Sequence, residues 1–145
     1  METKRVKRVF EGKFLDLFRN EFVYLDGTEV SREIVAKDNA VGIVAYDNVG
    51  VVLILQPREA TGKDNFIEIP AGTLDVRNEK PIDCAKRELL EETGYTASSW
   101  EQLTSFYSTP GCLTEQIVLF AATGLSLSPD GPEPTEFERI SVQKY

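Results

Sequence analysis

Residues 68–95 read EIPAGTLDVRNEKPIDCAKRELLEETGY, and this stretch decides the fold class. Its second half predicts a helix that begins near residues 79–81 and ends before Gly94. Pro81 falls in the expected first turn and a glycine follows the expected last turn, which is the usual asymmetry of helix ends. Three apolar residues recur at the i, i+3, i+7 spacing of a buried helix face: Ile82, Ala85 and Leu89.

The same helix carries an acidic face. An α-helix turns about 100° per residue, so Glu88, Glu91 and Glu92 lie within an arc of about 100°. Like charges at this spacing destabilise an isolated helix by some tenths of a kcal/mol per pair, roughly. A hard divalent cation that prefers carboxylate oxygens would offset the repulsion, and Arg87 can pair with Glu91 at i, i+4. The alternative is a solvated acidic face without a metal.

The spacing of the surrounding residues resembles the Nudix box, whose pattern is Gly, five residues, Glu, seven residues, Arg-Glu-apolar-x-Glu-Glu-x-Gly-apolar. From Glu79 to Tyr95 the match is complete, including the seven-residue gap. Upstream, six residues rather than five separate Gly72 from Glu79. An extra residue in a surface loop costs little, so the departure concerns Glu79 and not the helix.

The resemblance implies an α+β Nudix fold, a mixed β-sheet sandwich (α/β/α) with one catalytic helix after the Nudix loop. It implies that Glu88 and Glu92 are the principal metal ligands, Glu91 an auxiliary ligand, and the carbonyl of Ala71 a main-chain ligand. Mg²⁺ or Mn²⁺ suits such an all-oxygen site. The implied chemistry is attack of water on one phosphorus of a nucleoside diphosphate that is linked to another group.

Outside the box, the chain resembles the ADP-ribose pyrophosphatase branch, which includes other nucleoside diphosphate sugar hydrolases. The similarity lies in Gln56-Pro57-Arg58 followed by residues 68–72, in Ser108-Thr109-Pro110-Gly111 with Glu115, and in Gly12-Lys13-Phe14-Leu15 with Ser31-Arg32-Glu33. It implies hydrolysis of ADP-ribose, or a related nucleoside diphosphate sugar, to AMP and ribose 5-phosphate. It also implies a homodimer in which each N-terminal arm completes the partner's site.

This resemblance implies that several residues contact the substrate. Most of these expectations have a simpler alternative, which is given with them. Arg58 is expected to clamp a phosphate through its guanidinium, or else to be a solvated loop arginine. Phe14 is expected against adenine, or else in the core. Arg32 and Glu33 are expected to face the terminal sugar or base from the other subunit, or else to form a cross-strand ion pair. The expected substrate loop contains Pro110 and Gly111.

The general base is expected among three glutamates. In this branch a glutamate from the loop before the last strand activates water, and Glu136 best resembles that position. Glu133 lies close enough to be the alternative, and Glu115 is a third carboxylate expected to reach the cleft.

The rest of the chain is rich in predicted strands and turns. Residues 1–36 are predicted as an N-terminal antiparallel β arm for dimerisation, with a hairpin at Asp26-Gly27, and residues 37–145 as the Nudix hydrolase domain. Residues 40–46 and 51–55 read as strands buried on both faces, and residues 58–65 as a loop. A short strand is predicted at residues 66–69, a turn segment at 71–78, and further strands at 103–108, 116–123 and 137–142. Members of this branch usually continue past the last strand into a C-terminal helix. The sequence stops at Tyr145, so we expect this helix to be missing.

Composition restricts the function further. Acidic residues outnumber basic ones 24 to 16, which argues against general nucleic-acid binding. The chain has no histidine, so Ser-His-Asp catalysis and a histidine base are excluded. The two cysteines read as reduced thiols. No apolar run reaches membrane-spanning length, and a cytoplasmic location is expected.

Three other functions stay open. The first is a Nudix pyrophosphatase for another nucleotide, such as a nucleotide sugar, a dinucleoside polyphosphate or an oxidised nucleotide. The second is a non-catalytic Nudix module that binds nucleotide sugars, although such modules generally lose box carboxylates. The third is an interaction protein with a solvated acidic helix.

Overall fold

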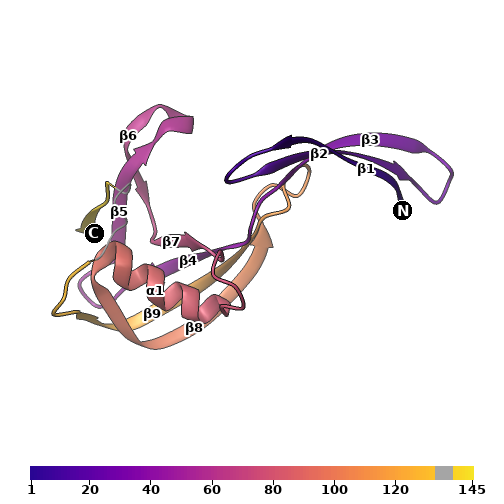
Figure 1. Cartoon of the computed structure of the whole chain (residues 1–145). Helices are drawn as coiled ribbons and strands as arrows, with labels where there is room; N and C mark the ends of the chain where they lie inside the picture. Colours follow the sequence, from indigo (N-terminus) through magenta and orange to yellow (C-terminus); the bar gives the residue numbers. More distant parts are fainter. Residues whose placement is uncertain (133–138) are drawn as a thin grey trace. The chain divides into compact units, whose positions relative to one another are not determined.

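The computed structural model describes residues 1–132 and 139–145. The elements in chain order are β1 (Glu2–Glu11), β2 (Asp16–Val23), β3 (Glu29–Ala36), β4 (Ala40–Ala45), β5 (Val52–Arg58), the 3₁₀ turn η1 (Glu59–Thr61), β6 (Lys63–Glu68), β7 (Ala71–Thr73), α1 (Pro81–Thr93), β8 (Tyr95–Tyr107), β9 (Gln116–Leu127) and β10 (Ser141–Lys144) (Figure 1). In this part of the chain, no helix is long and apolar enough to cross a membrane.

The chain divides into two compact units. The first contains residues 1–39 and 106–117, and the second contains residues 40–105 and 118–145. The first unit is built on the antiparallel sheet β1-β2-β3. At the predicted hairpin, the N–H of Gly27 donates to the carbonyl of Tyr24 at 3.0 Å, and Gly27 adopts a left-handed φ of 83° that favours glycine. The residues expected to form the arm therefore lie in this unit, together with residues 106–117.

The register of the first sheet separates two kinds of side chain. Directly opposite residues of an antiparallel pair share a face. Phe18 and Phe22 lie opposite Ile34 and Val30 on one face, which is called the apolar face although Asn20 lies opposite Arg32 between these two pairs. The other face carries cross-strand ion pairs such as Arg19–Glu33 at 3.0 Å. All the apolar side chains that are buried in the described chain lie outside residues 1–39, so this apolar face is not covered by a core of its own.

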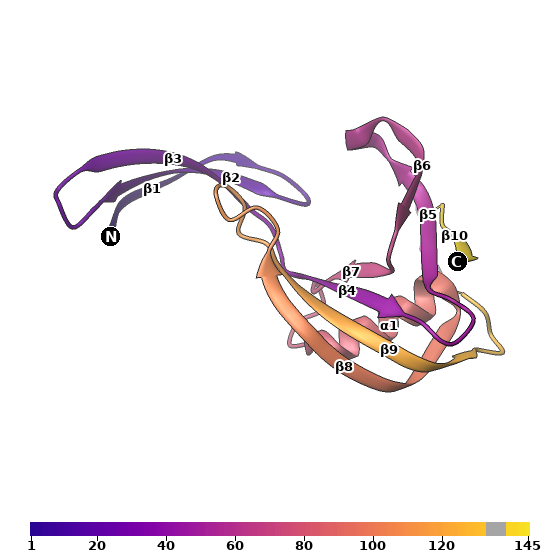
Figure 2. The same cartoon turned by 180° about the vertical axis from the view of Figure 1, so that it is seen from behind.

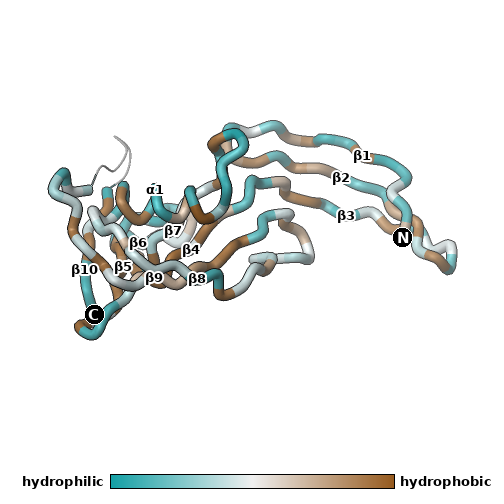
Figure 3. The backbone as a smooth tube through the Cα atoms, turned by 90° about the horizontal axis from the view of Figure 1, so that it is seen from below, coloured by the Kyte–Doolittle hydropathy of each residue, from teal (hydrophilic) through white to brown (hydrophobic). Residues whose placement is uncertain are grey.

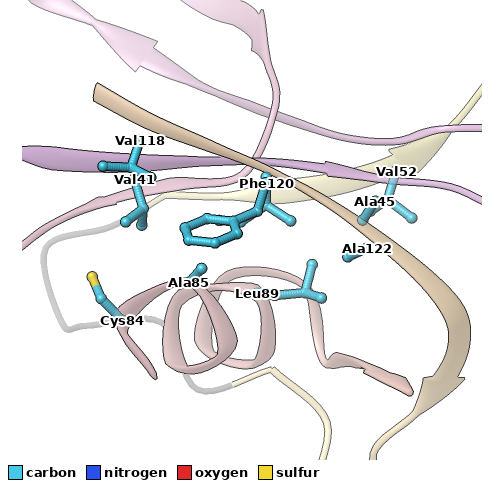
Figure 4. Close-up of a cluster of buried hydrophobic side chains, with 10 residues drawn as sticks. Val41, Ala45, Val52, Cys84, Ala85, Leu89, Val118, Phe120 and Ala122 are labelled. Carbon is cyan, nitrogen blue, oxygen red and sulfur yellow. The ribbon is translucent and has the colours of Figure 1, made fainter. Parts of the chain in front are cut away.

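The second unit contains the hydrophobic core. Its sheets have the strand orders β7-β4-β9-β8 and β10-β5-β6, and α1 packs on β4 and β7 (Figure 2). Figure 4 shows the core side chains between the helix and the strands: Val41, Ala45, Val52, Cys84, Ala85, Leu89, Val118, Phe120 and Ala122. Complete burial of a leucine side chain such as Leu89 contributes about 2–3 kcal/mol. The core therefore fixes which face of α1 stays outside.

The helix is where the sequence predicted it. Pro81 is its first residue, and Gly94 ends it with a left-handed φ of 72° and an N–H bonded to the carbonyl of Leu90 at 2.8 Å. Hydrophobic and hydrophilic positions alternate along α1, as Figure 3 shows. Both cysteines are free, Cys84 being buried and Cys112 exposed, and burial raises the pKa of the Cys84 thiol to about 12.

Several predicted strand boundaries were wrong. Residues 58–65 are not a loop: β5 runs to Arg58, η1 and a left-handed Gly62 make the turn, and β6 returns from Lys63. Backbone pairing formed this hairpin although its polar residues show no strand pattern. Part of the expected turn 71–78 is β7, which pairs with β4. Strand β8 begins at Tyr95, before the predicted residue 103, because a polar sequence suits an edge strand.

The predicted burial of β4 and β5 is correct only for β4. In β4 four of the six residues are buried, including neighbours that point to opposite faces, whereas β5 alternates between buried and half-buried positions from Val52 to Gln56. The alternation arises because β5 belongs to the three-stranded sheet β10-β5-β6, of which one face lies toward the core.

Candidate active site

Arg87 lies at the centre of the acidic face of α1. Its Nε and Nη2 donate to the two carboxylate oxygens of Glu79, each at 3.0 Å. Its Nη1 donates to Glu88 Oε1 at 2.7 Å and to Glu91 Oε2 at 3.1 Å, the second being the predicted i, i+4 pair. The hydrogen bonds with Glu79 raise the pKa of Arg87 and lower the pKa of Glu79. One guanidinium thus offsets the repulsion among three carboxylates.

The extra residue before Glu79 does not displace it from this cluster. The turn leading to α1 includes Asn78 with a φ of 64°, and asparagine tolerates this left-handed conformation better than most residues. The N–H of Glu79 donates to the carbonyl of Val76 at 3.1 Å. A turn of this shape takes up the additional residue and leaves the Glu79 carboxylate against Arg87.

Strand β7 lies directly against the acidic face of the helix. The N–H of Ala71 donates to Glu92 Oε2 at 2.9 Å, and Glu92 is only 4% exposed. A Cβ atom on Gly72 would lie 1.9 Å from Cδ of Glu88. Glycine at position 72 leaves this space to the Glu88 carboxylate, which a larger side chain would push aside.

We predict that Gly72→Ala lowers turnover while leaving the fold intact. The nearest atoms are the carboxyl end of a flexible side chain, so Glu88 can move aside without a shift of the backbone. Its carboxylate would then leave the cluster, and activity would fall by roughly 10- to 100-fold, as for other changes next to a metal site. Steady-state kinetics together with a circular dichroism melt would check this. An unchanged kcat would show that the position of Glu88 does not matter.

Arg58 lies at the end of β5 and is held by Glu68 of β6. Its Nε donates to Glu68 Oε1 at 2.9 Å and its Nη2 to Oε2 at 2.6 Å, while Gln56 Nε2 donates to the same Oε2 at 2.9 Å. The hydrogen bonds with Glu68 raise the pKa of Arg58, and the charge of Glu92 acts in the same direction. Arg58 therefore lies on a strand rather than in a loop, and its side chain is paired with Glu68 while 44% of it stays exposed to solvent. Its role as a phosphate clamp stays a prediction.

Two candidate substrate residues of the first unit are accessible. Phe14 is 77% exposed, which excludes the core alternative within this chain. It lines a pocket of about 270 Å³, and Lys13 Nζ lies 5.1 Å from the centre of its ring. Arg32 lines another pocket, of about 520 Å³, together with Pro110 and Gly111. The structure thus brings Arg32 and the expected substrate loop to one concave surface.

Glu33 and Glu115 are engaged with other side chains of the first unit. Glu33 forms a cross-strand ion pair with Arg19. A cross-strand ion pair was the alternative to its expected role in substrate binding. Glu115 is 8% exposed and accepts hydrogen bonds from Lys37 Nζ and from Ser108 Oγ, the latter at 2.9 Å. The other two candidate bases, Glu133 and Glu136, lie outside the described residues.

The donor set on α1 and β7 fits a hard divalent cation. It consists of the carboxylates of Glu88, Glu91 and Glu92 and the backbone carbonyl of Ala71, all oxygen ligands. Within residues 1–132 and 139–145, no three acidic, cysteine or histidine side chains are grouped in a ready metal-binding arrangement. Instead, Arg87 binds two of these carboxylates as well as Glu79.

The sequence analysis did not identify two hydrogen-bond partners of the candidate residues, namely Glu79 for Arg87 and Lys37 for Glu115. The bond between Arg87 and Glu79 and the contacts of Lys37 with Glu115 join residues that are 8 and 78 positions apart. The spacing within the Nudix box was a signal for the first pair, since both residues are fixed positions of the pattern. No sequence signal distinguished Lys37.

Comparison with known proteins places the chain in a family. Residues 36–144 match the model of the NUDIX domain. The chain belongs to the Nudix family. It is 34% identical over 138 residues to the ADP-ribose pyrophosphatase of Bacillus subtilis (strain 168), a match that covers 95% of this chain and 74% of the relative. It is also 39% identical over 106 residues to a GDP-mannose pyrophosphatase of Yersinia enterocolitica. That match covers 67% of this chain and 54% of the relative.

A solved structure supports the fold of this Nudix hydrolase. The crystal structure of an ADP compounds hydrolase matches with a TM-score of 0.86, and the match covers 99% of this chain and 77% of that chain at 20% sequence identity. The predicted α+β Nudix fold is therefore confirmed. Nudix hydrolases generally use divalent metal ions, which agrees with the oxygen donors on α1.

Proposed function

We propose that this Nudix hydrolase cleaves the pyrophosphate of ADP-ribose, or of a related nucleoside diphosphate sugar, to give AMP and ribose 5-phosphate. The observation that carries the proposal is the cluster on α1 and β7, in which Arg87 binds Glu79, Glu88 and Glu91 while Glu92 accepts from Ala71. The resemblance of Arg58 and the Pro110 loop to the ADP-ribose pyrophosphatase branch supports the choice of substrate, as does the relative of that name.

We assign the metal, Mg²⁺ or Mn²⁺, to Glu88 and Glu92, with Glu91 as an auxiliary ligand and the Ala71 carbonyl as a main-chain ligand. When bound, the metal supplies Lewis-acid stabilisation of the pyrophosphate charge and lowers the pKa of water. Arg87 orients the carboxylates through its hydrogen bonds. Net negative charge on the protein is compatible with a phosphorylated substrate if cations mediate the contact.

The remaining chemistry is assigned to residues away from the helix. Arg58, already oriented by Glu68, binds a phosphate oxygen of the substrate. Glu136 is proposed as the general base that takes the proton from water, with Glu133 and Glu115 as alternatives. Phe14, Arg32, Glu33, Pro110 and Gly111 contact the nucleoside and the sugar. A cytoplasmic location stays a prediction.

We also propose a homodimer in which residues 1–36 pack on the partner and complete its site, beside a Nudix domain of residues 37–145. The support is the apolar face of the first sheet, with Phe18, Phe22, Val30 and Ile34 in register, and the exposed Val6, Val9 and Phe10 of β1. Isolated apolar strands of this kind need a covering surface. Light scattering after gel filtration tests this: a monomer at micromolar concentration would contradict it.

The proposed reaction is tested by incubating the protein with a substrate panel and Mg²⁺. We expect AMP and ribose 5-phosphate from ADP-ribose, at a kcat/KM above that for the other compounds. The panel includes GDP-mannose, a dinucleoside polyphosphate and an oxidised nucleoside triphosphate. Preference for one of these would replace ADP-ribose as the substrate while leaving the Nudix chemistry intact.

The match to a GDP-mannose pyrophosphatase makes nucleotide sugars the second candidate substrate class. A non-catalytic binding module is a weaker candidate, because Glu88, Glu91 and Glu92 are all present. Tight binding of ADP-ribose without release of AMP in either Mg²⁺ or Mn²⁺ would favour the module. An interaction protein with a solvated acidic face predicts no metal binding at all.

A further inference from the structure

The end of β3 is bonded to the segment that connects β8 with β9. The N–H of Val35 donates to the carbonyl of Cys112 at 2.7 Å, and the N–H of Thr114 donates to the carbonyl of Val35 at 3.0 Å. These bonds form a parallel bridge between Val35 and Leu113. Residues 108–115 are therefore attached through their backbone to a strand about 77 positions earlier in the sequence.

Side chains extend this attachment beyond the end of β3. The hydroxyl of Thr114 accepts from the N–H of Lys37 at 3.1 Å and donates to the carbonyl of Lys37 at 3.2 Å. The N–H of Gln116 donates to Asn39 Oδ1 at 3.0 Å. Each of these contacts joins a side chain to a backbone group of the other segment, so together they fix the path of both segments.

An ion pair completes the attachment. Glu115 is nearly buried, and a buried carboxylate is stable only when it is paired and hydrogen-bonded. Lys37 Nζ donates to one of its oxygens, and Ser108 Oγ donates to the other at 2.9 Å. The N–H of Ser108 also donates to the carbonyl of Glu115 at 3.4 Å. Glu115 therefore joins both ends of residues 108–115 to Lys37.

We propose that Lys37 and Glu115 are positioning residues: their ion pair holds residues 108–115 on β3, and so sets the position of Pro110 and Gly111. The inference rests on the proposed function, which places those two residues against the substrate. Both Glu115 oxygens are engaged in holding the segment, so this proposal replaces the alternative in which Glu115 activates water. The candidates for the base narrow to Glu136 and Glu133.

Hydrogen exchange tests the attachment without any need for activity. In Lys37→Met, we expect the amides of Val35 and Thr114 to exchange at least about tenfold faster, while the amides of α1 keep their protection. Lys37→Arg should restore slow exchange, and Lys7→Met, an exposed lysine of β1, serves as the matched control. Should Lys37→Met not fold, Glu115→Gln removes the negative charge of the same ion pair, and its exchange is read in the same way. Unchanged exchange in the folded variant would overturn the proposal.

Kinetics separate positioning from catalysis. For Lys37→Met and Glu115→Gln we expect KM for ADP-ribose to rise about tenfold with kcat within about twofold, since only substrate binding is weakened. The double variant should be no worse than either single one, because both remove the same contact. A fall of kcat by about a hundredfold or more in Glu115→Gln alone would identify a general base and overturn the inference. If the wild type cleaves no nucleotide, the proposed function fails and the exchange experiment still decides the attachment.

Discussion

Glu92→Gln is expected to lose nearly all turnover of ADP-ribose, with kcat lower by more than about a hundredfold, because even residues that merely support metal ligands change activity by roughly 10- to 100-fold. The fold should survive. A glutamine oxygen can still accept the hydrogen bond from the N–H of Ala71, which spans 2.9 Å in the structure. The substitution removes one negative charge from a side chain that is 4% exposed and changes its volume very little.

The matched control for this variant is Glu101→Gln, an exposed glutamate of β8 in the same unit. It removes the same charge away from α1, and we expect wild-type kinetics. Circular dichroism and the thermal midpoint of each variant establish that both are folded. Equal activity of the two variants would mean that Glu92 does not hold a metal that hydrolysis needs.

Arg87→Met is expected to lower the free energy of unfolding by about 3 kcal/mol, as for the loss of one partner from a largely buried ion pair. For a chain of this size that corresponds to a fall of about 10 °C in Tm. The physical reason is the loss of the cation that neutralises Glu79, Glu88 and Glu91, whose side chains are 11%, 12% and 35% exposed. The effect should be largest with EDTA present.

A divalent cation should partly replace the missing guanidinium. Because a ligand that binds only the native state stabilises it, Mg²⁺ should raise the Tm of Arg87→Met by more than it raises that of the wild type. Lys86→Met, the exposed neighbour on the same helix, is the control and should melt like the wild type. Melting curves of Arg87→Met that do not change with Mg²⁺ would show that the carboxylates bind no cation.

The helix could be predicted because its signals are local. Pro81, Gly94 and the spacing of Ile82, Ala85 and Leu89 all act within a few turns, and the core in Figure 4 contacts the face they define. The Nudix fold followed from the fixed spacing of the box rather than from any single carboxylate. Gly72 also belongs to that pattern, although only the structure shows that its missing side chain makes room for Glu88.

What could not be predicted depends on residues distant in the sequence. Lys37 resembles any other surface lysine until β3 is placed beside residues 108–115. The pairing of Arg58 with Glu68 requires the β5–β6 hairpin, which polar residues without strand alternation conceal. Arg87 was expected to bind Glu91, but its contact with Glu79 depends on the turn at Asn78.

A titration with Mn²⁺ tests most directly whether α1 holds the metal. Binding is measured as the loss of the free-ion signal in electron paramagnetic resonance. The wild type and Glu101→Gln should bind the ion alike, and Glu92→Gln should bind it at least about tenfold more weakly. Equal binding by Glu92→Gln, or no binding by the wild type, would contradict the assignment of the acidic helix as the metal site.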